Sequence, residues 1–151
     1  MDALKLGDVM PFRGPFGVFT VPETETRPVE LVATGAGIAP IRSIILDRLP
    51  RTIVPLRLVF GNRSEEFLFF HEEFLELTQK FAHFTYVPTL SQPSDVWEGF
   101  RGRVTDILAH ETNSIGHPFY LCGNAGMIDD MRKVLATKGV PEGDVHFEKF
   151  F

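Results

Sequence analysis

The features that this sequence lacks exclude several classes of protein. It contains one cysteine, Cys122, which excludes an internal disulfide and any all-cysteine metal site built within this chain alone. No apolar run approaches the roughly 20 residues that are needed to cross a bilayer. The opening residues, Met1-Asp2-Ala3-Leu4, lack the basic region and apolar core of a signal peptide. We therefore predict a chain without a membrane span that works in the reducing cytoplasm.

Positive charge is also scarce. The 15 Lys and Arg residues against 20 Asp and Glu residues give a formal net charge of −5. Proteins bind phosphate backbones through clustered Lys and Arg, and no such cluster occurs here, so we expect no nucleic-acid partner. The five histidines are scattered without ligand spacing, so we expect no metal. What is plentiful is apolar residues, 44% of the chain, which is typical of a domain with a sizeable core.

The apolar segments alternate between two periods along the chain. Short β-branched or aromatic runs predict strands at 29–34, 55–60, 84–90, 119–122 and 145–150. Helical spacing of apolar residues predicts helices at 41–46, 67–81, 104–110 and 127–138. This order predicts an α/β fold: a doubly wound, five-stranded parallel sheet with helices on both faces, as in Rossmann-like nucleotide-binding domains. Ligands of such sheets lie beyond the carboxyl ends of the strands.

The loop between the first predicted strand and helix reads Thr34-Gly35-Ala36-Gly37-Ile38-Ala39-Pro40. Glycines there let the backbone approach a pyrophosphate, and the helix amino terminus supplies free N–H groups. Two departures weaken a plain dehydrogenase interpretation. Pro40 occupies the place of the third fingerprint glycine, and Gly61-Asn62-Arg63 ends the second strand without an acidic residue for the ribose. The alternative is that Gly35 and Gly37 only shape a turn.

Several ordered motifs resemble the ferredoxin–NADP reductase superfamily. Ala33 to Ser43 is similar to the family's nicotinamide-pyrophosphate motif, in which the loop ends in proline. The stretch from Tyr120 to Ile128 resembles its Cys-Gly signature, and the finish Phe147 to Phe151 resembles its aromatic carboxyl terminus. Residues 7–19 resemble the end of its flavin-binding barrel. The similarity covers nearly the whole chain.

The resemblance implies a division into two domains and a type of reaction. Residues 1–27 would be a short remnant of the flavin-binding β-barrel with its linker, and residues 28–151 an NAD(P)-binding domain. Hydride would pass from NAD(P)H to FAD, and electrons onward to a ferredoxin, an oxygenase or a similar protein acceptor. The flavin motifs of the barrel are missing here, so FAD is expected only in the complete protein. The alternative is a non-catalytic nucleotide-binding or regulatory module.

The resemblance also implies roles for individual residues. Cys122 is expected beside the nicotinamide ring as a catalytic residue, although free cysteine often packs as a small hydrophobe. Phe150 or Phe151 is expected to cover the flavin, with strand packing as the alternative. Met127 is expected near the adenosine or in the core. The expected cofactor-binding residues are Thr34, Gly35, Ala36, Gly37, Ile38, Pro40, Gly61, Arg63, Ser91, Gln92, Cys122, Gly123, Asn124, Met127, Phe150 and Phe151.

The pair Ser91-Gln92 bears on the choice of nicotinamide cofactor. NADPH-dependent relatives often have an arginine after this serine, where a guanidinium binds the extra phosphate. Gln92 replaces that arginine here, so the sequence favours NADH. Arg63, Arg101 and Arg103 are either substitutes for it or solvated surface charges.

Overall fold

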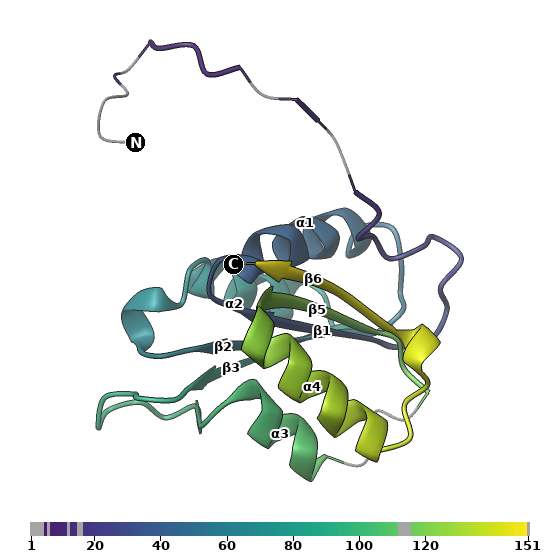
Figure 1. Ribbon diagram of the computed structural model, residues 1–151. Helices are drawn as coiled ribbons and strands as arrows, with labels where there is room; N and C mark the ends of the chain where they lie inside the picture. Colours follow the sequence, from purple (N-terminus) through teal and green to yellow (C-terminus); the bar gives the residue numbers. More distant parts are fainter. Residues whose placement is uncertain (1–4, 6, 12, 15–16, 112–115, 151) are drawn as a thin grey trace.

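The computed structural model describes residues 5, 7–11, 13–14, 17–111 and 116–150 (Figure 1). Six strands form one parallel sheet in the order β4-β3-β2-β1-β5-β6. The strands are β1 Val29–Thr34, β2 Leu56–Asn62, β3 Phe84–Leu90, β4 Phe100–Arg101, β5 Phe119–Asn124 and β6 Val145–Phe150. The helices are α1 Ile38–Arg48, α2 His71–Lys80, α3 Val104–His110 and α4 Ala125–Thr137, with 3-10 turns η1 Gly35–Gly37, η2 Glu65–Phe67 and η3 Glu142–Asp144.

The structure confirms the doubly wound parallel sheet and corrects its strand count. The strand that the sequence did not predict is β4, a two-residue edge strand inside the loop that follows β3. Gly102 N donates to the Leu90 carbonyl at 2.8 Å, and the Thr89 hydroxyl donates to the Gly102 carbonyl at 2.9 Å. Because β4 is so short and is held by these local bonds, it leaves no periodic pattern to detect.

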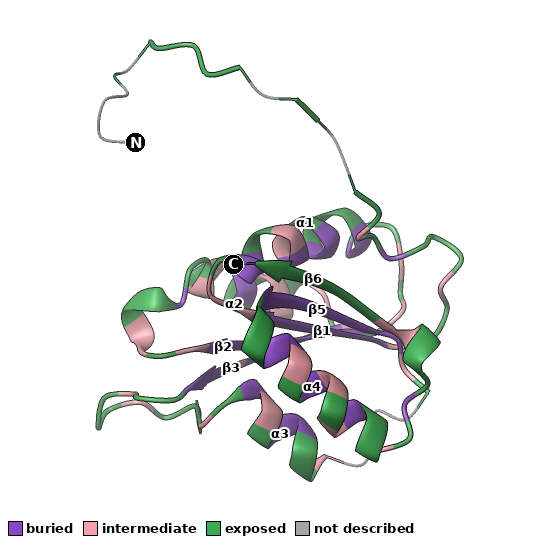
Figure 2. Cartoon of the chain, in the orientation of Figure 1, coloured by how far each residue is buried: buried purple, intermediate pink, exposed green. Residues whose placement is uncertain are grey.

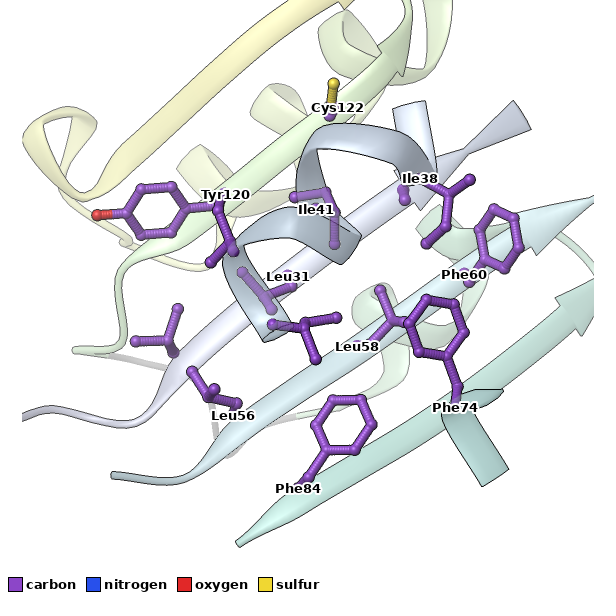
Figure 3. Packing of buried hydrophobic residues seen from close by; sticks show 14 of the residues in the cluster. Leu31, Ile38, Ile41, Leu56, Leu58, Phe60, Phe74, Phe84, Tyr120 and Cys122 are labelled. Carbon is purple, nitrogen blue, oxygen red and sulfur yellow. The ribbon is translucent and has the colours of Figure 1, made fainter. Parts of the chain in front are cut away.

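Helices α1 and α2 cover one face of the sheet, and α3 and α4 cover the other (Figure 1). On one face, Leu31 and Ala33 of β1 share a core cluster with residues of α1 and α2, and on the other face Val32 shares a cluster with α3 and α4. This alternation follows the two-residue period of a strand. The central strands are therefore buried on both sides, as Figure 2 shows. Figure 3 shows the first cluster, in which Phe74 of α2 is completely buried.

Helix α2 is shorter than the predicted segment 67–81. Phe70 precedes it with φ 63°, a left-handed conformation that no other non-glycine residue adopts in the described part of the chain. This residue separates η2 from α2, so the aromatic pattern continues where the helix does not. Phe70 stays 45% exposed, and the guanidinium of Arg42 lies 4.6 Å above its ring centre.

The described residues among the first 27 form an extended segment without helix or strand, running away from the sheet (Figure 1). Its end is anchored: the ring of Phe19 packs edge-on against Tyr120 with centroids 5.8 Å apart, and Val21 is buried. Arg27, just before β1, donates to Asp144 Oδ1 at 2.9 Å and makes a second ion pair with Glu25. The predicted division at residue 27 stays a prediction, because the described residues show no barrel strand.

Candidate functional site

A cleft of about 440 Å³ opens at the carboxyl ends of the central strands. The chain builds β2 and β3 on one side of β1 and returns to place β5 on the other, so the order reverses between β1 and β5. Open α/β sheets bind their ligands at this switch point. The cleft is lined by Thr34, Gly35, Gly61, Asn62, Arg63, Ser91, Gly102, Arg103, Val104, Thr105, Asn124, Gly126, Met127 and Asp130.

Two glycines let backbones and side chains approach closely around the cleft. A Cβ on Gly61, near the end of β2, would lie 2.6 Å from Val104 Cγ1 of α3. A Cβ on Gly123, in β5, would lie 2.2 Å from Thr34 Oγ1 and 2.8 Å from Met127 Cε. Both distances are far below ordinary contact, so any larger residue would displace the wall of the cleft.

Gly37 lies against the backbone of β5, whereas a glycine of a phosphate-binding loop is expected to face the ligand. A Cβ on this residue would lie 2.2 Å from the carbonyl oxygen of Cys122 and 2.7 Å from Gly123 N. Gly37 therefore lets the start of α1 pack directly against the backbone of β5, and it does not line the cleft. Ala36 and Pro40 do not line it either, and Ile38 is buried in the core cluster with the strands.

Unpaired hydrogen-bonding groups lie along one half of the cleft, which is formed by the ends of β1 and β2 and the start of α4 and is called the first half. Within the described residues, Thr34 Oγ1 and Asn62 Nδ2 are buried polar atoms without a hydrogen-bond partner. Asn124 caps α4, its Oδ1 accepting from Met127 N at 2.8 Å. The helix geometry leaves the N–H groups of Ala125 and Gly126 without an intrahelical acceptor. A helix start with free N–H groups favours an anionic ligand.

The second half of the cleft, between the loop after β2 and the start of α3, carries positive charge. Arg63 follows β2 and Arg103 precedes α3, and no carboxylate in the described ranges lies within 4.0 Å of either guanidinium. The one acidic residue in the lining, Asp130, pairs with Lys133 at 3.1 Å. This half is therefore suited to a phosphate or another anion.

The loops after β2 and β3 are joined by their backbones. Ser91 N donates to the Asn62 carbonyl at 3.0 Å, and Gln92 N donates to the Arg63 carbonyl at 2.8 Å. Ser91 lines the cleft, whereas Gln92 does not. Arg101 is engaged elsewhere: its Nη2 donates to three loop carbonyls, those of Ser94 and Trp97 at 3.0 Å and that of Asp95 at 3.4 Å.

Cys122 lies in β5 with its side chain in the core cluster beneath α1 (Figure 3). The residue is completely buried and does not line the cleft. Burial raises the pKa of its thiol to about 12, and nearby Glu148 adds to the effect. The thiol is therefore neutral at physiological pH and is not a nucleophile.

Phe150 closes β6 opposite Asn124 of β5 and is 39% exposed. It does not line the cleft, and Phe151 lies outside the described residues. The structure thus brings together seven of the expected residues: Thr34, Gly35, Gly61, Arg63, Ser91, Asn124 and Met127. It leaves Ala36, Gly37, Ile38, Pro40, Gln92, Cys122, Gly123 and Phe150 outside the lining.

Seven lining residues were not among the expected cofactor-binding residues, although Arg103 had been considered as a substitute phosphate ligand. A rule of the fold accounts for some of them. The amino end of α3 reaches the cleft because a helix that follows a parallel strand starts at the carboxyl edge of the sheet. The seven residues are Asn62, Gly102, Arg103, Val104, Thr105, Gly126 and Asp130.

Two features do not occur among the described residues. Within them, no three His, Cys, Asp or Glu side chains gather closely enough to hold a metal ion. No helix in the described ranges has the length and hydropathy of a membrane-crossing segment.

Comparisons with known proteins agree with this geometry. Residues 31–133 match the family described as "Oxidoreductase NAD-binding domain". The reductase component of propane 2-monooxygenase from Rhodococcus jostii is 31% identical over 99% of this chain and 42% of its own length. The reductase component DmpP of phenol 2-monooxygenase from a Pseudomonas species is 35% identical over 98% of this chain and 43% of its own length. The chain thus spans less than half the length of these curated relatives.

Solved structures give the same result. The Amycolatopsis cytochrome P450 reductase GcoB superposes with a TM-score of 0.82 at 28% identity, covering 91% of this chain and 42% of that protein. The FAD/NAD-binding domain of nitric oxide dioxygenase from Vibrio cholerae gives a TM-score of 0.81 at 26% identity over 90% of this chain and 56% of that domain. These findings confirm the resemblance to the NAD(P)-binding domain of ferredoxin–NADP reductases.

Proposed function

Since this chain belongs to the oxidoreductase NAD-binding domain family, we propose that its cleft binds a nicotinamide dinucleotide and that it is the pyridine-nucleotide half of a flavoprotein reductase. One observation carries the proposal most directly. Thr34 Oγ1 is buried at the cleft without a partner among the described residues, although such groups in folded proteins are nearly always satisfied. A bound ligand with hydrogen-bonding groups would satisfy it.

The residues present suit a dinucleotide. Thr34 ends β1 and Gly35 follows it, while Asn124 caps α4 and Gly126 lies in its first turn, so hydroxyl, backbone and helix-end donors line the same cleft. We assign the pyrophosphate to this half of the cleft. Arg63, which follows the neighbouring strand β2, would neutralise its charge, and Met127 gives an apolar surface for a base.

The bound dinucleotide supplies hydride chemistry, which belongs to the cofactor. The neutral, buried thiol of Cys122 contributes shape and excludes water at the end of β5. We propose that residues 28–151 form the nucleotide-binding domain and that residues 1–27 belong to the end of a flavin-binding barrel and its linker. FAD would be held by a barrel domain outside these 151 residues, with Phe150 facing it. A ferredoxin, an oxygenase or a similar protein would accept the electrons.

Binding through Thr34 is testable by removing only its hydroxyl. Thr34→Val keeps the shape and removes a buried group that has no partner in the free protein, so thermal stability should not fall. Titration with NADH should show affinity lower by about ten-fold, the worth of one hydrogen bond of about 1.4 kcal/mol.

Thr78→Val is the matched control, because that hydroxyl donates to the Leu75 carbonyl within α2, away from the cleft. Equal NADH affinity in wild type and Thr34→Val would remove Thr34 from the site. If wild type shows no affinity for NADH, the whole proposal fails. If NADH binds but the chain joined to its flavin domain transfers no hydride, a nucleotide-binding module replaces the reductase.

We further propose NADH as the preferred donor. Gln92 carries no charge, and Arg101 is already bound to loop carbonyls, so neither offers a guanidinium for the extra phosphate of NADPH. Of the two arginines that line the cleft, we assign Arg63 to the pyrophosphate, which leaves Arg103 as the other candidate for that phosphate. Gln92→Arg should therefore improve NADPH affinity relative to NADH by about ten-fold. Gln79→Arg, the same charge change on the exposed side of α2, is the control. Tighter binding of NADPH than NADH by the wild type would contradict the preference.

A further inference from the structure

A cluster of charged side chains lies at the amino ends of the strands, at the edge of the sheet opposite the cleft. Glu30 of β1 and Arg57 of β2 are register partners, and Arg57 Nη1 donates to Glu30 Oε2 at 3.2 Å. His117 Nδ1, just before β5, lies 3.4 Å from Glu30 Oε1. The Glu30 side chain is 6% exposed and that of Arg57 21%, so this cluster is not a solvated surface pair.

Arg57 binds a second carboxylate, at the end of helix α3. Its two terminal nitrogens donate to the two oxygens of Glu111 at 2.7 and 2.6 Å, a bidentate arrangement that fixes distance and orientation. Lys138, which follows α4, donates to the carbonyl of the same residue. The carboxyl end of α3 is thus joined to β2 and to α4 by charged side chains.

The amino end of the same helix forms part of the cleft. Arg103, Val104 and Thr105 line it, and Val104 packs against Gly61 of β2. Helix α3 has seven residues, so the two ends lie only about 10 Å apart. A short helix moves as one body, so displacement of Glu111 at one end also displaces the cleft wall at the other.

The net stability of this cluster does not by itself explain its arrangement. Burial of Glu30 raises the pKa of its carboxyl group, with Arg57 and His117 acting in the opposite direction. Buried ion pairs often contribute little net stability compared with apolar residues of the same size. What the pair between Glu30 and Arg57 does provide is one fixed direction for the guanidinium, toward Glu111.

We propose that Arg57 and Glu111 are positioning residues for the nucleotide cleft: they hold α3 at its far end, with Glu30 orienting Arg57, so that Arg103, Val104 and Thr105 keep their places on the cleft wall. This inference rests on the proposed binding of a nicotinamide dinucleotide. These side chains lie at the opposite edge of the sheet and touch no ligand, so they would affect binding only through the position of α3.

The test uses Glu111→Gln, which keeps the side chain's size and removes its charge. The dissociation constant for NADH is measured well below the melting temperature, where the chain is fully folded and stability alone does not alter affinity. We expect affinity to fall by about three-fold or more, the range of measured couplings through packed elements. Arg57→Lys keeps the positive charge beside Glu30 but loses the bidentate bond, and should act in the same direction.

Asp144→Asn is the matched control. It also removes a carboxylate charge paired with an arginine, at 2.9 Å from Arg27 Nη1, but Asp144 belongs to η3 and not to an element that lines the cleft. Its NADH affinity should change by less than about two-fold, as for independent sites. Unchanged affinity in Glu111→Gln, or an equal loss in the control, would overturn the inference. Absence of NADH binding by the wild type would instead refute the proposed function.

Discussion

Replacing Gly37 by alanine tests how closely the first helix must approach the sheet. The added Cβ would lie 2.2 Å from the Cys122 carbonyl oxygen, 2.4 Å from its carbon and 2.7 Å from Gly123 N. Ordinary contact begins near 3.4 Å, so α1 or β5 must move by roughly 1 Å. The obstacle is backbone on a central strand, which has no rotamer to change.

The expected cost is at the upper end of that for overpacking, about 3 kcal/mol. For a domain of this size, this corresponds to a fall in melting temperature of roughly 6–12 °C. The melting temperature is followed by circular dichroism. Gly143→Ala is the control, because a Cβ there meets nothing within 4 Å and the backbone angle is ordinary. A melting temperature of Gly37→Ala within about 2 °C of the control would show that β5 and η1 are not packed as described.

Three other outcomes follow from single contacts. The Arg27 guanidinium lowers the pKa of Glu25 to about 2. The ionised Glu25 therefore stabilises the fold above pH 4.5, and this stabilisation is lost as the pH falls toward 2. In Glu25→Gln, the melting temperature should depend less on pH over that range. The buried thiol of Cys122 should react with iodoacetamide at pH 8 on the order of a thousand-fold more slowly in the native chain than in urea, and rapid native labelling would contradict its placement. Asn124→Ala removes the cap that accepts from Met127 N and should lower the free energy of unfolding by about 1 kcal/mol, measured by urea denaturation.

The sequence predicted the elements whose pattern comes from burial. The first, third and last predicted strands have the observed bounds. Burial explains this for the central strand β1, whereas β6 is an exposed edge strand that is marked by the turn before it. The start of α2 was wrong, since an aromatic stripe does not show that Phe70 takes a left-handed conformation. Strand β4 was missed because two residues carry no period.

The site was predicted in part for a similar reason. A motif places a loop at the right edge of the sheet but does not state where each side chain points. Thr34 and Gly35 reach the cleft, whereas Gly37 faces β5 and Cys122 faces the core. Arg103 was considered only as a substitute phosphate ligand, because its place on the cleft wall depends on how α3 leaves the loop after β3.

The contact between Arg27 and Asp144 joins the residues just before β1 to the turn that leads into β6. Together with Phe19 on Tyr120, it fixes where the polypeptide leaves the sheet and along which side it departs. Any domain attached through this segment would therefore be tethered beside β6, at an effective concentration that free diffusion would not reach. The two domains of such a protein would then be joined by a linker with one anchored end. Even a weak interface between them would be enough for them to associate.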